Sequence, residues 1–267
     1  AATCKGCTAH CNLNIIRFSG GGRFISGNRC EKGAGIKMKS KAENLFDWKY
    51  QQILQLEQTV PEKPIATVGL PLGLNFYDQM PLWHTLFTDL GFRVKFSEES
   101  TRETYYKGQS TIPSDTVCYP AKLMHGHIQS LLDQKVDFIF YPCMSYNLDE
   151  GDSDNHFNCP VVAYYPELLL ANHEGLNHQN FLFPFLDLNR EKHVVSVLYQ
   201  YFGAYVSKKA IQAALRHGYA ALEEHRAAIA QKGQEIIAAA REENRKIIVL
   251  AGRPYHIDPE INHGIHK

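Results

Sequence analysis

The spacing of apolar and polar positions changes several times along the chain, and each change predicts a different kind of element. Near the start, two short runs rich in isoleucine and phenylalanine, residues 12–18 and 23–26, flank a Ser-Gly-Gly-Gly turn. This arrangement predicts a β-hairpin. Residues 45–56 carry apolar side chains at helical spacing, and the two prolines of residues 60–64 then break the chain.

The central part alternates between short apolar runs and longer amphipathic stretches, the pattern of an α/β fold. We expect strands at residues 65–70, 92–96, 138–141 and 161–165, and helices at residues 80–90 and 118–132. A right-handed crossover from the first strand to the second makes the sheet parallel. The prediction is a Rossmann-like parallel-sheet lobe.

The last third of the chain predicts a long, alanine-rich helical arm at residues 191–246. The apolar run at residues 247–251 then predicts a strand, followed by Gly-Arg-Pro-Tyr-His. The same order of strand, glycine, proline and aromatic residue occurs at residues 68–71 and just after them, which indicates a weak internal repeat. We therefore expect a second, truncated α/β lobe and hence a segment of a longer protein. The predicted domains are 1–60, the cysteine-rich hairpin and linker helix; 61–190, the α/β lobe; 191–246, the arm; and 247–267, the start of the second lobe.

Composition narrows the functional classes. The chain has 267 residues with 28 basic and 28 acidic side chains, so bulk electrostatics does not favour nucleic acid. The first fifty residues hold nine basic and three acidic side chains, which fits a docking face, charge compensation near thiolates or a small nucleic-acid-binding ribbon. No apolar run approaches the ~20 residues that cross a bilayer, and the start has no leader pattern, so we predict a cytoplasmic protein.

Seven cysteines are an odd number for a disulfide framework, and their spacing favours metal. Cys4, Cys7, Cys11 and Cys30 lie in and around the predicted hairpin. If Phe18 pairs with Arg23, the same register sets Cys11 opposite Cys30 and completes a four-thiolate shell. Such a shell binds zinc or an iron–sulfur cluster, and the spacing favours zinc because it differs from the bacterial ferredoxin pattern. The alternative is that some of these cysteines are small buried apolar residues.

Cys118, Cys143 and Cys159 form a second group. Cys118 begins a predicted helix and Cys143 follows a predicted strand, so both fit the carboxyl edge of the sheet, where sites form in α/β folds. A helix N-terminus favours the thiolate, which serves as metal ligand or nucleophile. Cys159 precedes its predicted strand and is expected on the opposite edge, which leaves its role open.

Cys118 also admits a different interpretation, a thiol enzyme with a histidine base. His125 and His127 lie seven and nine residues along the same predicted helix, one to two turns away, so neither obviously reaches the sulfur. The chain has neither a Gly-x-Gly-x-x-Gly turn nor a Gly-x4-Gly-Lys-Ser/Thr loop, so ATP is not expected in this segment.

Five motifs together resemble a known family. They are Cys-x2-Cys-x3-Cys from Cys4, Ser-Gly-Asn-Arg-Cys-Glu-Lys-Gly at 26–33, Leu-Asn-Phe-Tyr at 74–77, Ser-Asp-Thr-Val-Cys-Tyr-Pro-Ala-Lys at 114–122 and Ala-Gly-Arg-Pro-Tyr-His-Ile-Asp-Pro at 251–259. The chain resembles the large acyl-CoA dehydratase activase-related proteins, in which an activator similar to that of 2-hydroxyglutaryl-CoA dehydratase is fused to a dehydratase-like portion. These proteins are found in anaerobic bacteria.

The resemblance implies an ATP-driven, low-potential electron-transfer system in which an activator domain reduces an iron–sulfur centre that acts on an acyl-CoA. By the same resemblance, Cys118 and Cys143 hold a cluster, with Cys159 as a further candidate, and the second lobe contributes to a complete site. The expected partners are the activator ATPase domain and the second lobe of the same polypeptide, with an acyl-CoA substrate and neither nucleic acid nor membrane. The alternative is a structural or interaction module that has zinc at the N-terminal cysteines and no catalysis of its own.

Overall fold

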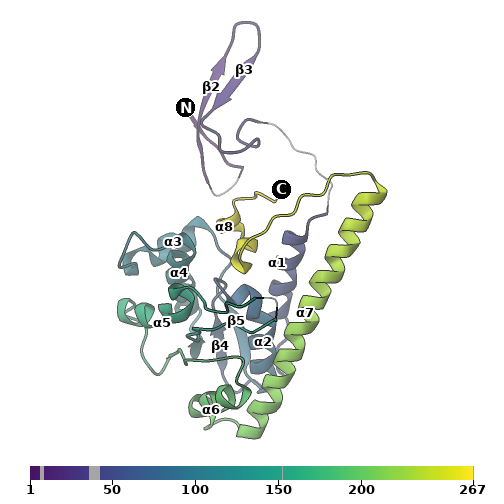
Figure 1. The fold of residues 1–267 in the computed structure, drawn as a ribbon. Helices are drawn as coiled ribbons and strands as arrows, with labels where there is room; N and C mark the ends of the chain where they lie inside the picture. The colour runs from purple at the N-terminus through teal and green to yellow at the C-terminus, as the bar shows by residue number, and fades with distance from the viewer. Residues whose placement is uncertain (7–8, 36–42, 152, 267) are drawn as a thin grey trace.

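The computed structural model describes residues 1–6, 9–35, 43–151 and 153–266 and has a mixed α/β architecture (Figure 1). The strands are β1 (Ala2–Thr3), β2 (Asn12–Arg17), β3 (Arg23–Ser26), β4 (Thr67–Leu70), β5 (Arg93–Phe96), β6 (Phe138–Phe140) and β7 (Phe181–Leu182). The α-helices are α1 (Leu45–Leu56), α2 (Phe76–Asp89), α3 (Arg102–Gly108), α4 (Tyr119–Asp133), α5 (Pro160–Asn172), α6 (Glu191–Phe202), α7 (Lys208–Glu242) and α8 (Pro259–Asn262). Two short 3₁₀ turns, η1 (Gln109–Thr111) and η2 (Pro254–Ile257), complete the described elements.

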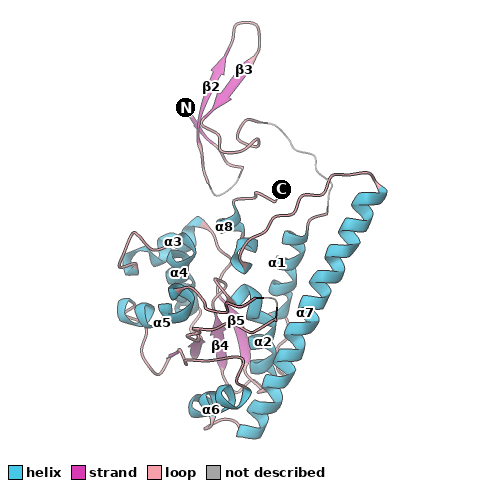
Figure 2. Ribbon diagram, in the orientation of Figure 1, coloured by secondary structure: helices cyan, strands magenta, loops and turns pink. Residues whose placement is uncertain are grey.

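The main sheet has four parallel strands in the order β5-β4-β6-β7, with helices around it (Figure 2). The predicted parallel α/β fold is therefore confirmed. β4, α2 and β5 form the predicted crossover unit, and the ends of these elements lie within a few residues of the prediction. The carboxyl ends of the four strands share one edge of the sheet, because all four run in the same direction.

The strand predicted at residues 161–165 is wrong, since these residues belong to α5. Pro160 occupies the first turn of this helix, where its missing N–H costs nothing and its fixed φ suits the helix. The buried positions Val162, Ala163, Tyr165 and Leu169 follow helical spacing, and the helix is 13 residues long, which is more than a typical strand. The fourth strand is instead β7, whose two residues are too few to give a sequence pattern.

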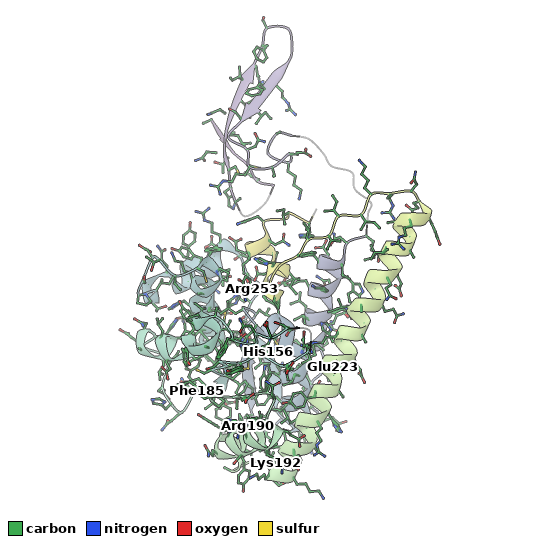
Figure 3. All side chains as sticks on the ribbon, viewed as in Figure 1. His156, Phe185, Arg190, Lys192, Glu223 and Arg253 are labelled. Carbon is green, nitrogen blue, oxygen red and sulfur yellow. The ribbon has the colours of Figure 1, made fainter. Side chains whose placement is uncertain are left out.

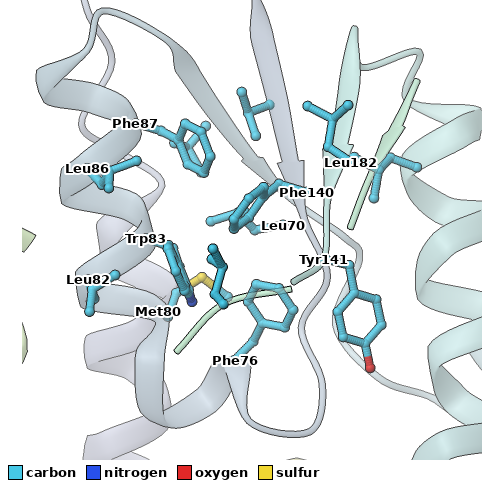
Figure 4. Packing of buried hydrophobic residues seen from close by; sticks show 14 of the residues in the cluster. Leu70, Phe76, Met80, Leu82, Trp83, Leu86, Phe87, Phe140, Tyr141 and Leu182 are labelled. Atoms are coloured by element: carbon cyan, nitrogen blue, oxygen red, sulfur yellow. The ribbon is translucent and has the colours of Figure 1, made fainter. Parts of the chain in front are cut away.

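Aromatic side chains of α2 fill the space over the sheet (Figure 4). The ring centroids of Trp83 and Phe87 lie 5.1 and 5.0 Å from that of Phe140 on β6, with edge-on geometry. All three side chains are fully buried. Truncating a buried aromatic side chain costs about 3–5 kcal/mol, so this cluster anchors the central strand to α2.

The predicted helical arm forms two helices, α6 and α7, and α7 runs alongside α2 and α1 (Figure 1). Its buried positions 211, 214, 215, 218 and 222 recur every three to four residues and make one helical face. At Gly218 the two backbones approach so closely that a Cβ would lie 2.8 Å from the Leu82 carbonyl oxygen. The first half of this helix is thus part of the packed core.

The N-terminal hairpin forms, but its predicted register is wrong by one residue. Arg17, and not Phe18, pairs with Arg23, and the five intervening residues make the turn. The Phe18 N–H donates to the Gly22 carbonyl (2.9 Å), and Gly21 adopts φ +82°, a conformation that glycine tolerates best. β3 ends at Ser26, so strand pairing does not set Cys11 opposite Cys30.

Within the described residues, no strand forms at 247–251, contrary to the prediction. Ile248 and Val249 are 83% and 82% exposed. A β-strand needs a hydrogen-bonding neighbour, and this run has none in the part of the chain that the structure describes. η2 and α8 follow. Across the described helices, none has both the length and the apolar character needed to cross a bilayer.

Helices α3 and α4 cross where Gly108 faces Gly126, and this contact generates a prediction. A Cβ on Gly126 would lie 1.7 Å from the Thr104 carbonyl oxygen, so Gly126→Ala forces the helices apart. We expect a loss of about 3 kcal/mol or more in the free energy of unfolding, measured by urea denaturation followed by tryptophan fluorescence. Gly233→Ala in α7 is the matched control, because its Cβ meets only Leu45 at 3.7 Å.

The control should gain up to about 1 kcal/mol, since alanine favours the helix. Equal urea midpoints for Gly126→Ala and the unchanged chain would contradict the packing of α3 against α4.

Candidate functional site

The three central cysteines lie at the carboxyl edge of the parallel sheet, each on a different segment. Cys118 is the N-cap of α4, and Cys159 is the N-cap of α5. Cys143 lies three residues beyond β6 and bridges to Phe185 beyond β7. Both helices run antiparallel to the strands they precede, so their N-termini face the edge where the strands end. The expectation that Cys159 lies on the opposite edge is wrong, because α5 replaces the strand on which it depended.

Local sequence explains how the two helices present their cysteines. Cys118 and Cys159 have nearly identical extended backbones, with φ/ψ of −63°/152° and −65°/156°. Pro120 and Pro160 occupy the first turns, where the missing N–H is tolerated. Neither cysteine side chain accepts a capping hydrogen bond, so both sulfurs remain available at the positive end of a helix dipole.

The Tyr141 hydroxyl is influenced electrostatically by all three cysteines. This hydroxyl is buried and has no hydrogen-bond partner among the described residues. Burial raises the pKa of Tyr141 well above its ordinary value, and negative charge on Cys143, Tyr165, Cys159 and Cys118 raises it further. Three sulfurs from three segments are thus within electrostatic reach of one hydroxyl. Figure 4 shows the Tyr141 ring leaving the apolar cluster with its oxygen pointing away from it.

The sulfurs differ in their surroundings. Cys118 is exposed, Cys159 is half-buried and Cys143 is buried. Burial raises the pKa of the Cys143 thiol to about 12, and the Glu167 carboxylate adds to the effect. Without a ligand that replaces its proton, Cys143 is a neutral thiol at pH 7.

The described side chains form no site for a single metal ion. Among the described residues, no group of three or more histidine, cysteine, aspartate and glutamate side chains is arranged to hold one metal ion. An iron–sulfur cluster spreads its thiolate ligands farther apart, because iron and sulfide atoms lie between them.

Some of the described N-terminal cysteines also lie near one another. The Cys4 N–H donates to the Cys11 carbonyl (2.8 Å), which continues the pairing of β1 with β2. The Gly6 N–H donates to Cys4 Sγ (3.4 Å), the type of hydrogen bond that stabilises a thiolate ligand. Cys11 and Cys30 line the same cavity of about 720 Å³. Cys7 lies outside the described residues.

The two histidines considered as bases for Cys118 use both ring nitrogens elsewhere. His125 contacts the Thr111 hydroxyl (2.7 Å) and the Tyr165 hydroxyl (2.9 Å). His127 bridges Ser97 (2.8 Å) and Ser100 (3.0 Å). Burial lowers the pKa of His125 to about 4 and that of His127 to about 3. Both rings are therefore neutral and hold neighbouring loops, so neither is placed to act as the base for Cys118.

Two buried carboxylates attach the C-terminal motif to the lobe, a role that sequence reasoning missed. Asp258 accepts hydrogen bonds from the Tyr77 hydroxyl (2.7 Å) and the Ser100 hydroxyl, and caps α8 through the Glu260 N–H (2.8 Å). Glu260 accepts from the hydroxyl of Tyr119, the neighbour of Cys118 (2.8 Å). Asp-Pro-Glu at the start of a short helix is the signal that could have indicated the cap.

This attachment brings Tyr255 to the cysteines. Burial raises the pKa of Tyr255, the Arg253 guanidinium opposes the rise, and charges on Cys118 and Cys159 add to it. The segment before α8 therefore lies over the carboxyl edge of the sheet, where both cysteines begin their helices. Tyr255 thus belongs to the electrostatic surroundings of these cysteines.

The chain belongs to the family described as the CoA enzyme activase uncharacterised domain, which matches residues 67–267. This match confirms the resemblance to acyl-CoA dehydratase activase-related proteins at the level of the family. It begins at the first residue of β4 and includes the sheet, the three central cysteines and the C-terminal motif. No curated protein and no solved structure matches the chain.

The neutral buried histidines predict stability that falls with acid. The folded pKa of His127 is below the ordinary value of 6.5, so its contribution is present above pH 6.5 and is lost as the pH falls toward about 3. At pH 5 the loss is about 2 kcal/mol for this residue. His127→Gln should flatten the dependence of the unfolding free energy on pH between 8 and 5 by about this amount.

Urea denaturation at several pH values measures the effect. His178→Gln, on an exposed loop, is the control and should leave the slope unchanged. An unchanged slope in His127→Gln would show that His127 is not buried in its neutral form.

Proposed function

We propose that Cys118, Cys143 and Cys159 bind an iron–sulfur cluster, and that the chain takes part in low-potential electron transfer within a CoA enzyme activase system. The observation that carries the proposal is the placement of three cysteines along the carboxyl edge of the sheet, two at helix N-termini and one beyond a strand end. Family membership supports an activase-like system in general.

The surroundings of the cysteines suit a redox cluster. Thiolates are the usual ligands of iron–sulfur clusters, and burial, hydrogen bonds and nearby charge set the reduction potential. The N-termini of α4 and α5 offset negative charge at Cys118 and Cys159. When bound, the cluster supplies one-electron chemistry. Three cysteines leave room for a further ligand from another part of the protein.

Residues around the cysteines have supporting roles in this proposal. Tyr255, on the segment held through Asp258, lies within electrostatic reach of Cys118 and Cys159. The Tyr141 hydroxyl lacks an acceptor among the described residues and is available as a hydrogen-bond donor to bound sulfur or ligand. Both tyrosines help to set the local polarity, on which the potential depends.

The rest of the system lies outside this chain in the proposal. The sequence has no phosphate-binding loop, so ATP hydrolysis is assigned to a neighbouring activator domain. An acyl-CoA is the expected substrate of the whole protein.

A second candidate is a structural module with zinc at Cys4, Cys7, Cys11 and Cys30. The observations that favour it are the Gly6 N–H bond to Cys4 Sγ and the backbone pairing of Cys4 with Cys11. The two candidates involve different cysteines, so metal analysis separates them.

The test is the iron, acid-labile sulfide and zinc content, with a visible absorption spectrum, of the chain purified without oxygen. We expect about four irons and four sulfides per chain at the central site. Cys118→Ala and Cys159→Ala should each remove most of the iron and the visible absorption. Cys4→Ala is the matched variant at the other cysteine group and should keep this iron.

Zinc near one per chain without sulfide, lost in Cys4→Ala, would replace the cluster proposal with the structural module. Iron that is unaffected in both Cys118→Ala and Cys159→Ala would also overturn the cluster proposal. Far-ultraviolet circular dichroism of each variant verifies that the fold is retained.

A further inference from the structure

A second hollow, separate from the cysteines, lies between helices α1 and α7 and the segment that precedes α8. It has a volume of about 180 Å³. Five basic side chains from three parts of the chain line it: Lys49 from α1, His225 and Arg226 from α7, and Arg253 and His256 from the C-terminal segment. We call it the basic pocket. Figure 3 shows Arg253 on this segment and Glu223 on α7.

Two cations of the basic pocket have no acidic partner among the described residues. Arg226 is paired with acidic groups around it, since it lies 2.5 Å from Glu150, 2.9 Å from Glu223 and 3.5 Å from Asp78. Neither Lys49 nor Arg253 has a carboxylate within ion-pair distance in the part of the chain that the structure describes. Asp78, a carboxylate on the pocket wall, already faces Arg226.

The pKa values of two basic groups on the pocket wall are lowered. Burial lowers the pKa of Lys49, and Asp78 compensates only in part. Burial also lowers the pKa of His225, and the charges of Lys49 and Arg226 lower it further. The wall also carries Arg253 and His256 on the C-terminal segment and Tyr77 on α2. A half-buried lysine near other cations is costly unless an anion joins it.

The size of the pocket limits what that anion can be. About six water molecules fill this volume at ~30 Å³ each, which admits one phosphate group with a short extension but not a whole nucleotide. Arginine contacts phosphate through two parallel N–H groups, and lysine contacts it as a point charge. Arg253 and Lys49 offer this combination from two sides of the hollow.

We propose that the basic pocket binds a phosphate group, with Lys49 and Arg253 as its direct ligands. The group is either free phosphate or the terminal phosphate of a larger ester whose remainder lies outside the pocket. This inference uses none of the cysteines and stands independently of the cluster proposal.

The test is isothermal titration calorimetry of the full chain with inorganic phosphate, CoA and dephospho-CoA, alongside an NMR titration of the His225 ring. Bound phosphate should raise the pKa of His225, because it counters the cations that depress that value. Lys49→Gln and Arg253→Gln should each weaken binding about tenfold or more, since each removes a charged hydrogen bond. Lys209→Gln, an exposed cation elsewhere on α7, is the matched control and should bind as the unchanged chain does.

Tighter binding of CoA than of dephospho-CoA, with the His225 response, would identify the group as the 3′-phosphate of a CoA. A response to inorganic phosphate alone would identify free phosphate. In either case, Lys49→Gln and Arg253→Gln must also weaken the binding of the phosphate probe. The inference is overturned if no probe alters His225, or if the two variants and Lys209→Gln bind alike.

Discussion

Parallel pairing of β6 with β4 and β7 is the constraint on which the candidate site depends. Parallel strands require crossovers, and each helix that returns the chain runs antiparallel to the strand it precedes. The N-termini of α4 and α5 must therefore begin at the edge where β6 ends. The packing of Trp83 and Phe87 on Phe140 holds this arrangement, because it fixes the central strand against α2.

The segment before α8 connects the two sites that the structure suggests. Asp258 and Glu260 attach it to the lobe through Tyr77, Ser100 and Tyr119. On one side Tyr255 lies within electrostatic reach of Cys118 and Cys159, and on the other Arg253 lines the basic pocket. One short stretch of chain therefore contributes to both places, so a shift of this segment at one of them changes the surroundings of the other.

The buried histidines show how polar residues stabilise this lobe without taking part in chemistry. His127 joins Ser97, at the end of β5, to Ser100, which also donates to Asp258. A hydrogen-bonded chain therefore runs from α4 through the loop after β5 to the C-terminal segment. A buried network that is fully satisfied specifies one arrangement of its loops, because each broken bond leaves an unsatisfied polar group in a medium of low dielectric constant.

The sequence by itself determined the parallel α/β fold and the helix that begins at Cys118, because periodic burial and turn residues act locally. It also placed Cys143 at a strand end. It failed where the outcome depended on partners distant in the chain. The sequence of residues 161–165 fits a buried strand and a buried helix equally well, and tertiary packing makes it part of α5. Because Cys159 precedes this helix, it lies at the carboxyl edge of the sheet. The run at 247–251 has a strand's composition but no neighbour to pair with among the described residues. Tertiary structure alone decided three further features: the placement of the three cysteines near Tyr141, the attachment through Asp258, and the lack of acidic partners for Lys49 and Arg253 among the described residues. Each of these joins residues whose separation in sequence carries no periodic signal.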